Sequence, residues 1–474
     1  MALPKPKKGD TMETQTEPVS LKASEAKGLR LFSLTWPIFL ELLLFTLIGI
    51  TDTFMLSGVS DEAVSAVGAA NQFVFIAILV LEVIGHGASI VVSQYIGSRK
   101  LQEAAKIGAI AVTLNLAIGI LISVCFLLFG STLLVAMNLQ GEILSLAKSY
   151  IAIVGGGLFL QALINTLASL IRTYGFTRES MLISLGINIV HVAGNYLLIF
   201  GNLGFPELGV EGAAISTVLS RGVGLLVFFW AYYRLVDYKV TFQDYIQINK
   251  SYVRKICRVG IPAAFEQITY NGCQSIFLYY VTFLGAAALA SRQYVSNISM
   301  LIYLFSVAIG MGTAIITGRL VGAGRNDEAY GRVWKSLRWG LICTLIINLL
   351  VILFREPIMG LFTKDPDVIR ISTQVILLSI FLESGRVFNI ILISSLRAAG
   401  DAKFPVYMGL ISMVGVSLPL GYVLAFQANL GLAGVWLAVA VDEWIRGVVM
   451  FFRWRSRIWE QKSLIEKEQV PLPR

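Results

Sequence analysis

A small set of polar side chains stands inside long apolar segments of this sequence, where the set could bind a cation or carry a proton. Asp52 provides a carboxylate, and His191 and Asn195 are i,i+4 neighbours on one helix face. Thr217 adds a hydroxyl at the same expected depth, and Asn188 lies just before His191. A charge buried in hydrocarbon costs roughly 2.5–3.5 kcal/mol on the insertion scale. These residues are therefore candidates for cation coupling, although a buried network that only satisfies its own members would look the same.

A second set of polar residues is predicted to face a substrate cleft at the centre of the protein. The candidates for this cleft are Glu41, Gln72, Glu266, Asn297, Glu383, Arg386 and Asn389. Glu383 and Arg386 share one helix face and could equally form a structural pair whose charges neutralise each other. Arg221 is predicted to form a structural ion pair with Asp442 or Glu443.

About twelve apolar stretches must position these residues, and each is long enough to cross a bilayer as a helix. The 474-residue chain is 56% hydrophobic and only 14% charged, with a mean hydropathy of +0.75. About 20 apolar residues span the hydrocarbon core of a membrane. The predicted helices cover residues 31–57, 64–96, 102–128, 143–171, 179–203 and 210–235, then 253–283, 288–320, 327–354, 367–397, 402–426 and 430–455. The fold class is therefore an all-α integral membrane protein.

An internal repeat divides the predicted helices into two lobes. Pro37 and Glu41 recur as Pro262 and Glu266, so the two copies lie 225 residues apart (262 − 37). Because each copy has an even number of crossings, six, both copies enter the membrane from the same side. They are then related by a pseudo-twofold axis along the membrane normal. Transporters of this build place their site between the lobes and alternate access by rocking one lobe against the other.

Basic residues orient the chain in the membrane. Lys and Arg gather in alternate loops, whereas the intervening loops are almost free of them. By the positive-inside rule both termini are cytoplasmic, and the net charge of +9 reflects topology rather than a nucleic-acid surface. The expected order is a disordered cytoplasmic tail over 1–30, an N-lobe over 31–235, a cytoplasmic linker over 236–252, a C-lobe over 253–455 and a cytoplasmic tail over 456–474. The chain from Arg453 onward is expected to be solvated.

The sequence lacks the motifs of common enzymes and metal sites. It contains no HExxH, GxSxG or GxxxxGK[ST] pattern, and its two histidines lie on different predicted helices. Its four cysteines are scattered and form no CxxC pair, which argues against a disulfide framework or a metal site. We therefore expect a protein that moves a solute across a membrane, with no enzymatic activity, no cofactor beyond a coupling ion and no nucleic-acid partner.

The chain also carries a specific combination of motifs. The motifs are Pro37 followed by Asp52-Thr53, Gly85-x-Gly87, the segments 170–175 and 396–401, and the runs 196–201 and 209–214. Together they resemble the multidrug and toxic compound extrusion (MATE) family over nearly all of the chain beyond its tails. The resemblance implies antiport, in which a cation moves inward while an amphipathic, often cationic organic compound is exported. It also implies a monomer in the bacterial cytoplasmic membrane.

The resemblance carries over the N-lobe cation site but not the sodium-type C-lobe site. Asp52 matches the first-helix carboxylate of the family, while His191 and Asn195 stand where some members have Asn and Asp. Tyr270 and Arg386 stand where sodium-type members have Glu and Asp. Losing a carboxylate and gaining an imidazole favours H⁺ as the coupling ion, with Na⁺ as the alternative. The alternative function is a lipid-linked oligosaccharide or lipid flippase of the same superfamily, whose anionic substrate is disfavoured because membrane carboxylates outnumber membrane arginines.

Overall fold

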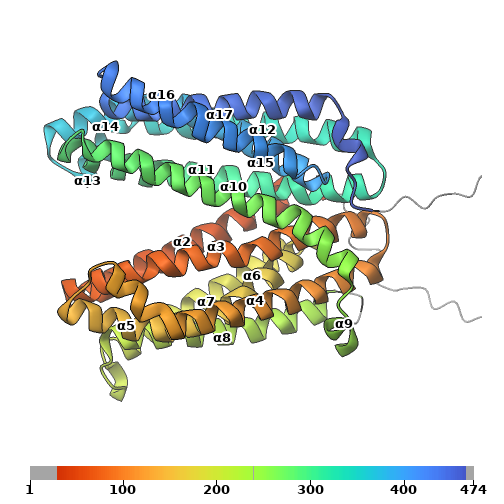
Figure 1. Cartoon of the computed structure of the whole chain (residues 1–474), viewed down its shortest axis with the longest axis horizontal. Helices are drawn as coiled ribbons and strands as arrows, with labels where there is room; N and C mark the ends of the chain where they lie inside the picture. Colours follow the sequence, from red (N-terminus) through yellow and green to blue (C-terminus); the bar gives the residue numbers. More distant parts are fainter. Residues whose placement is uncertain (1–28, 237, 239, 466–474) are drawn as a thin grey trace, which may run out of the picture.

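The computed structural model describes residues 29–236, 238 and 240–465, and these residues form helices and no strand. The predicted N-terminal tail, apart from its last two residues, lies outside this range, as do residues 466–474. Figure 1 shows two bundles of helices, one from each half of the chain.

The helices of the N-lobe are α2 (Leu31–Ser57), α3 (Asp61–Gly97), α4 (Leu101–Ala136), α5 (Gly141–Gly156), α6 (Leu158–Thr173), α7 (Thr177–Leu198) and α8 (Gly209–Leu235). The short α9 (Phe242–Ile246) follows between the lobes. The helices of the C-lobe are α10 (Lys250–Thr282), α11 (Ala286–Gly322), α12 (Asn326–Leu353), α13 (Arg355–Phe362), α14 (Pro366–Ala398), α15 (Lys403–Ser412), α16 (Leu418–Tyr422) and α17 (Gly431–Arg455). Two π-helical segments, Met413–Ser417 and Val423–Gln427, make α15 and α16 parts of one continuous span.

The number of crossings agrees with the predicted twelve. Among the described residues, nine spans are long and apolar enough to cross a membrane, and the bent pair α5–α6 makes a tenth. The remaining two are α10, which begins with several basic residues, and α17, which contains Asp442, Glu443 and Arg446. The predicted two-lobe, all-α membrane fold is confirmed.

The bounds of the helices preserve the internal repeat. Helices α3 and α11 both contain 37 residues, and their bounds differ by 225 at each end (286 − 61 and 322 − 97). Helices α6 and α14 end at Thr173 and Ala398, which are again 225 residues apart (398 − 173). The repeat read from single residues therefore extends to whole helices.

One predicted helix is broken in the structure. The segment expected as a single helix over 143–171 forms α5 and α6, which meet at an angle of 44°. Three consecutive glycines, Gly155 to Gly157, stand at the break, and glycine disfavours the helix interior. They also allow close packing, since a Cβ on Gly155 would lie 2.8 Å from the ring of Phe126. The matching α14 is unbroken over 33 residues.

The two lobes meet at one end of the molecule, which we call the closed end. It contains the C-terminal ends of α3, α6, α11 and α14, and α9 lies at the same end (Figure 1). The helices that touch across the lobes are α2 and α3 on one side and α10 and α11 on the other. Toward the opposite end the two bundles separate in the same view (Figure 1). Each lobe keeps apolar clusters of its own.

The chain after α17 is packed against the protein rather than solvated, contrary to the prediction. Trp454 and Trp459 are fully buried, and their rings stack with centroids 4.2 Å apart. Leu464 is 3% exposed. Apolar side chains spaced along a charged segment explain the error, because net charge dominates the composition of the tail while a few large apolar residues determine its packing.

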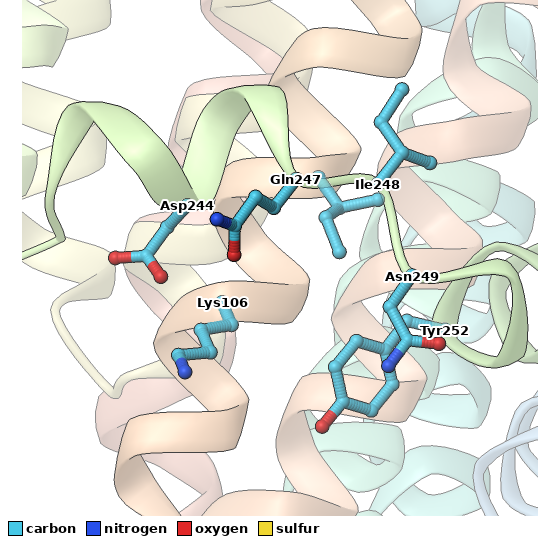
Figure 2. A pocket seen from close by; sticks show the side chains of 7 residues that line it. Lys106, Asp244, Gln247, Ile248, Asn249 and Tyr252 are labelled. Atoms are coloured by element: carbon cyan, nitrogen blue, oxygen red, sulfur yellow. The ribbon is translucent and has the colours of Figure 1, made fainter.

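A hollow of about 340 Å³ lies between α4 and the interlobe segment that contains α9. Lys106, Asp244, Asn249 and Tyr252 are among its lining residues, and their side chains surround it in Figure 2. None of the predicted site residues lines it. The chemistry of the chain therefore has to be sought in the helix bundles.

Candidate ion-coupling site and buried ion pairs

The Asp52 cluster lies where α2, α7 and α8 meet in the N-lobe. Asn195 Nδ2 donates a hydrogen bond of 2.7 Å to Asp52 Oδ1, and His191 Nε2 lies 3.3 Å from the same oxygen. His191 Nε2 is also 3.2 Å from Thr217 Oγ1. All four side chains are buried. The structure therefore brings together four of the five residues predicted for cation coupling.

Thr217 determines which atom of His191 carries hydrogen. The single hydroxyl hydrogen of Thr217 is donated to the carbonyl oxygen of Ala213 at 2.9 Å. Thr217 must then accept from His191, so Nε2 carries a hydrogen that it shares between Thr217 and Asp52. Among the described residues, His191 Nδ1 and Asn195 Oδ1 are buried without a hydrogen-bond partner. The cluster thus contains a carboxylate that is only partly satisfied and two free acceptor atoms.

Arg221 on α8 adds positive charge to the same site. Its charge acts on Asp52, and its Nη1 is buried with no hydrogen-bond partner in the described part of the chain. The predicted pairing of Arg221 with Asp442 or Glu443 is wrong, because Arg446 lies 2.8 Å and 3.0 Å from those two carboxylates. Sequence position gave the depth of Arg221 but not the lobe in which its partner lies.

The other polar candidates do not join the Asp52 cluster. Asn188 donates to the carbonyl oxygen of Ser184, one turn earlier in its own helix, at 2.8 Å. Gln72 and Asn297 are exposed on α3 and α11, and Asn297 accepts from Gln293 on the same helix at 3.4 Å. Gln72 and Asn297 are repeat partners, so both lobes present an amide from the same helix position.

Glu41 forms a buried ion pair at the meeting of α2, α6 and α7. Arg172 Nη1 lies 2.8 Å from Glu41 Oε1. The hydroxyls of Ser180 and Ser184 donate to the same oxygen at 2.9 Å and 3.1 Å. Three donors on one carboxylate oxygen stabilise its charged form, because hydrogen bonds to ionised groups are the strong ones. Glu41 is therefore held as a charged partner rather than displayed in an open cleft.

Glu266 forms the equivalent pair in the C-lobe. Arg397 Nη2 lies 2.6 Å from Glu266 Oε2, and both members stand 225 residues after Glu41 and Arg172 (266 − 41 and 397 − 172). Sequence analysis assigned the two arginines to basic loops and so missed these pairs. A signal was present, because an acid and a base that recur at one offset must recur at one relative position in each lobe.

The C-lobe contains a larger network of buried charge between α14 and α17. Arg386 Nη1 lies 2.7 Å from Glu383 Oε1, and its Nε lies 3.8 Å from Glu443 Oε1. Asn389 donates to the other oxygen of Glu443 at 2.8 Å. Arg446 joins Glu443 to Asp442, at 3.0 Å and 2.8 Å. Three of the predicted cleft residues therefore belong to a chain of alternating acids and bases.

Comparison with known proteins identifies the family. The MatE family model matches residues 37–197 and 262–423, one stretch in each lobe. The chain belongs to the MatE family. Its two matched stretches contain Asp52 and Glu41 in the N-lobe and Glu266 and the Glu383–Arg386 pair in the C-lobe.

Relatives within the family extend over the whole chain. An "Uncharacterized transporter YisQ" from Bacillus subtilis (strain 168) is 42% identical over 445 residues, which cover 94% of this chain and 98% of that protein. A "Probable multidrug resistance protein NorM" from Thermotoga maritima is 27% identical and covers 93% and 95% of the two chains. This MatE chain is thus similar to full-length transporters and not to a fragment of them.

Solved MATE structures share the fold. The Vibrio cholerae MATE transporter VcmN superposes with a TM-score of 0.84 at 19% identity and covers 93% of this chain and all 100% of its own. A multidrug resistance MATE transporter described as being in an outward-facing conformation superposes with a TM-score of 0.80 at 22% identity, covering 91% and 98% of the two chains. The two-lobe architecture of the MatE chain is therefore the architecture of these proteins.

Proposed function

We propose that this MatE chain is a proton-coupled antiporter that exports amphipathic, cationic organic compounds. The observation that carries the proposal is the Asp52 cluster, a buried carboxylate contacted by N–H groups of His191 and Asn195 and lying near Arg221. Because an ionised side chain inside a membrane is costly, one that can change its charge state is suited to coupling. The NorM relatives, described as probable multidrug resistance proteins, support the choice of substrate class.

The composition of the cluster favours a proton over a sodium ion. Hard cations prefer several oxygen ligands, whereas His191 directs a hydrogen at the Asp52 carboxylate and Arg221 adds a positive charge. Both groups repel a metal ion at that carboxylate. A proton needs only one lone pair of a carboxylate oxygen, and it leaves the remaining hydrogen bonds of the cluster in place.

Coupling would follow from mutual exclusion. Ionised Asp52 attracts an organic cation, while protonated Asp52 has no charge to offer and releases it. If the basic loops mark the cytoplasm, the closed end is cytoplasmic and the described state is open to the outside, where Asp52 would take up its proton. Rocking of the lobes would then expose the site to the cytoplasm, where the proton leaves and the substrate enters. The protein would act as a monomer in the bacterial cytoplasmic membrane with both termini inside.

Purified protein in liposomes tests this proposal. A fluorescent organic cation is loaded, and its movement is driven by an imposed proton gradient or an imposed sodium gradient. Asp52→Asn, which keeps the size of the side chain but cannot ionise, is expected to reduce proton-driven transport at least tenfold, or about 1.4 kcal/mol. Glu207→Gln, in an exposed loop, is the control and should leave transport unchanged.

Two outcomes would contradict the proposal. Full transport by Asp52→Asn would remove Asp52 from the coupling mechanism. Transport driven by sodium and not by protons would replace the coupling ion. Absence of transport in the unaltered protein, with any dye of a chemically varied panel, would reject the substrate class.

A further inference from the structure

Two hydrogen bonds cross between the lobes at the closed end, and they are repeat partners of each other. Gln94 Nε2 on α3 donates to the carbonyl oxygen of Ala398 at the end of α14, at 2.6 Å. Arg319 Nη2 on α11 donates to the carbonyl oxygen of Thr173 at the end of α6, at 2.7 Å. Donors and acceptors both keep the offset of 225 (319 − 94 and 398 − 173). Each lobe therefore binds the last carbonyl of the equivalent helix in the other lobe.

The helices that carry these donors cross without intervening side chains. A Cβ on Gly97 of α3 would lie 2.0 Å from the carbonyl oxygen of Arg319, and a Cβ on Gly322 of α11 would lie 1.9 Å from that of Gln94. Neither position can hold any residue but glycine without a shift of the backbone. The two lobes thus touch backbone to backbone at this end, with one side-chain hydrogen bond beside each crossing.

The segment after α17, residues 456–465, which we call the strap, is rooted on the C-lobe. Within it, η4 (Ile458–Gln461) places Trp459 in the C-lobe apolar cluster, where its Nε1 donates to the carbonyl oxygen of Trp454 at 2.9 Å. Arg457 pairs with Asp327 at the start of α12. Further along, a Cβ on Gly400 would lie 2.1 Å from the carbonyl oxygen of Lys462, so the strap lies directly on the backbone after α14.

The tip of the strap, in contrast, is bound to the N-lobe. The backbone N–H of Leu464 donates to Gln94 Oε1 at 2.8 Å, and the hydroxyl of Ser463 donates to the same oxygen at 3.3 Å. The Leu464 side chain belongs to the apolar cluster that contains Val91 and Tyr95 of α3. The strap therefore joins the two lobes, and Gln94 binds the C-lobe through its nitrogen and the strap through its oxygen.

We propose that the strap is a conformational lock on the closed end, and that its tip must leave Gln94 before the lobes can part there. The inference rests on alternating access in the proposed function. Since the root is fixed on the C-lobe and the tip is buried in the N-lobe, separating the lobes must either extract Leu464 or tear Trp459 from its cluster. Extraction of Leu464 loses two hydrogen bonds and exposes an apolar side chain to water.

The lock is present on one half only of an otherwise reciprocal contact. Arg319, the repeat partner of Gln94, has only donors in its guanidinium and cannot accept a bond from a backbone N–H. Gln94 has both a donor and an acceptor in one amide, so it can hold a helix end and a strap together. The asymmetry of the residue pair therefore matches the asymmetry of the chain, which has a single strap.

Distance measurement across the closed end tests the lock. Spin labels are attached through Gln102→Cys on α4 and Glu328→Cys on α12, both exposed, in a variant whose four native cysteines are replaced by alanine. The protein is placed in lipid nanodiscs. A chain ended after Lys462 lacks the tip, whereas a chain ended after Ile465 keeps it and is the matched control.

Loss of the tip is expected to raise the ratio of long to short inter-label distances roughly tenfold, as the loss of a buried leucine and its hydrogen bonds implies. The control chain should give the distances of the full chain. Leu464→Asn, which keeps the backbone N–H, should give a smaller rise and decides the question if the shortened chain does not fold. Distances that are the same with and without the tip, and unchanged in Leu464→Asn, overturn the lock.

A further variant separates this proposal from the proposed function. Gln94→Leu removes the amide that binds both the helix end and the strap, and it should give more of the long distance than loss of the tip alone. If Gln94→Leu opens the closed end while loss of the tip does not, the strap is no lock but the lobes do part. If no variant produces the long distance at any pH, alternating access itself is rejected. Dye transport does not enter either result.

Discussion

The two lobes hold their buried carboxylates in different ways, although they descend from one repeated plan. In the N-lobe, Asp52 is a single carboxylate with an imidazole, an amide and a nearby guanidinium. In the C-lobe, three carboxylates and two guanidiniums form a continuous chain of ion pairs between α14 and α17. A site whose charges are already paired is suited to hold shape. A site with one carboxylate and free acceptor atoms is suited to change state.

The strongest test of this contrast is removal of a central base from the C-lobe network. Arg446→Met leaves Asp442 and Glu443 buried together without their shared partner. We expect a loss of about 3–5 kcal/mol in stability, as is typical when one member of a buried pair is removed. Thermal unfolding in detergent measures it, with Arg325→Met in an exposed pair as the control. A melting temperature equal to that of the unaltered protein would mean that the network contributes nothing to stability.

The second test exchanges the roles of the two sites. Glu383→Gln should destabilise the protein by about 1–3 kcal/mol, because Arg386 loses its charged partner, yet leave proton-driven transport coupled. Asp52→Asn should do the reverse, with transport lost and the melting temperature nearly kept. Both variants are measured in both assays. If Glu383→Gln abolishes coupling as strongly as Asp52→Asn, the division of labour between the lobes is wrong.

The third test compares equivalent residues directly. Glu41 accepts from Arg172 and two serine hydroxyls, whereas Glu266 accepts from Arg397. Glu41→Gln should therefore cost about 1–2 kcal/mol more stability than Glu266→Gln, since more charge-assisted bonds are weakened. Thermal unfolding of the two single variants gives the difference. An equal or opposite order would show that the serine hydroxyls do not add to the Glu41 pair.

The smallest expected effect concerns the direction of one hydrogen bond. Thr217→Val keeps the shape of the side chain but removes the oxygen that accepts from His191. Nε2 then has only Asp52 as a partner, and we expect proton-driven transport to fall roughly two- to fivefold. Ser220→Ala, one turn along α8, is the control because its hydroxyl donates to its own helix. An unchanged rate would indicate that Thr217 does not position the imidazole.

Sequence position predicted depth well and partners poorly. The repeat and the apolar lengths gave the two lobes, and helix direction put Asp52, His191, Asn195 and Thr217 at one level, where the structure brings them together. Depth alone cannot give the direction in which a side chain points around its helix. Arg221 was for this reason assigned to the wrong lobe, since its partner depends on how α8 packs and not on where it lies along the membrane normal.

Other features depend on contacts that leave little trace in a single sequence. The bend at Gly157 arises where three glycines meet neighbouring helices, and isolated glycines elsewhere do not break their helices. Arg172 and Arg397 were read as loop charges because basic residues at helix ends usually are, yet each turns toward an acid of the first helix of its lobe. The burial of Trp459 depends on the surface of the folded C-lobe.

The side-chain-free crossing of Gly97 and Gly322 has a consequence for the economy of the cell. A membrane protein that uses an ion gradient must not become a pore, because each leaked ion discharges the energy store that drives transport. At this crossing the backbones approach too closely for even a methyl group to fit, so there is no room for a file of water molecules through which protons could hop. Insulation of this kind does not depend on the charge or rotamer of any residue, and it persists whatever the pH on either side.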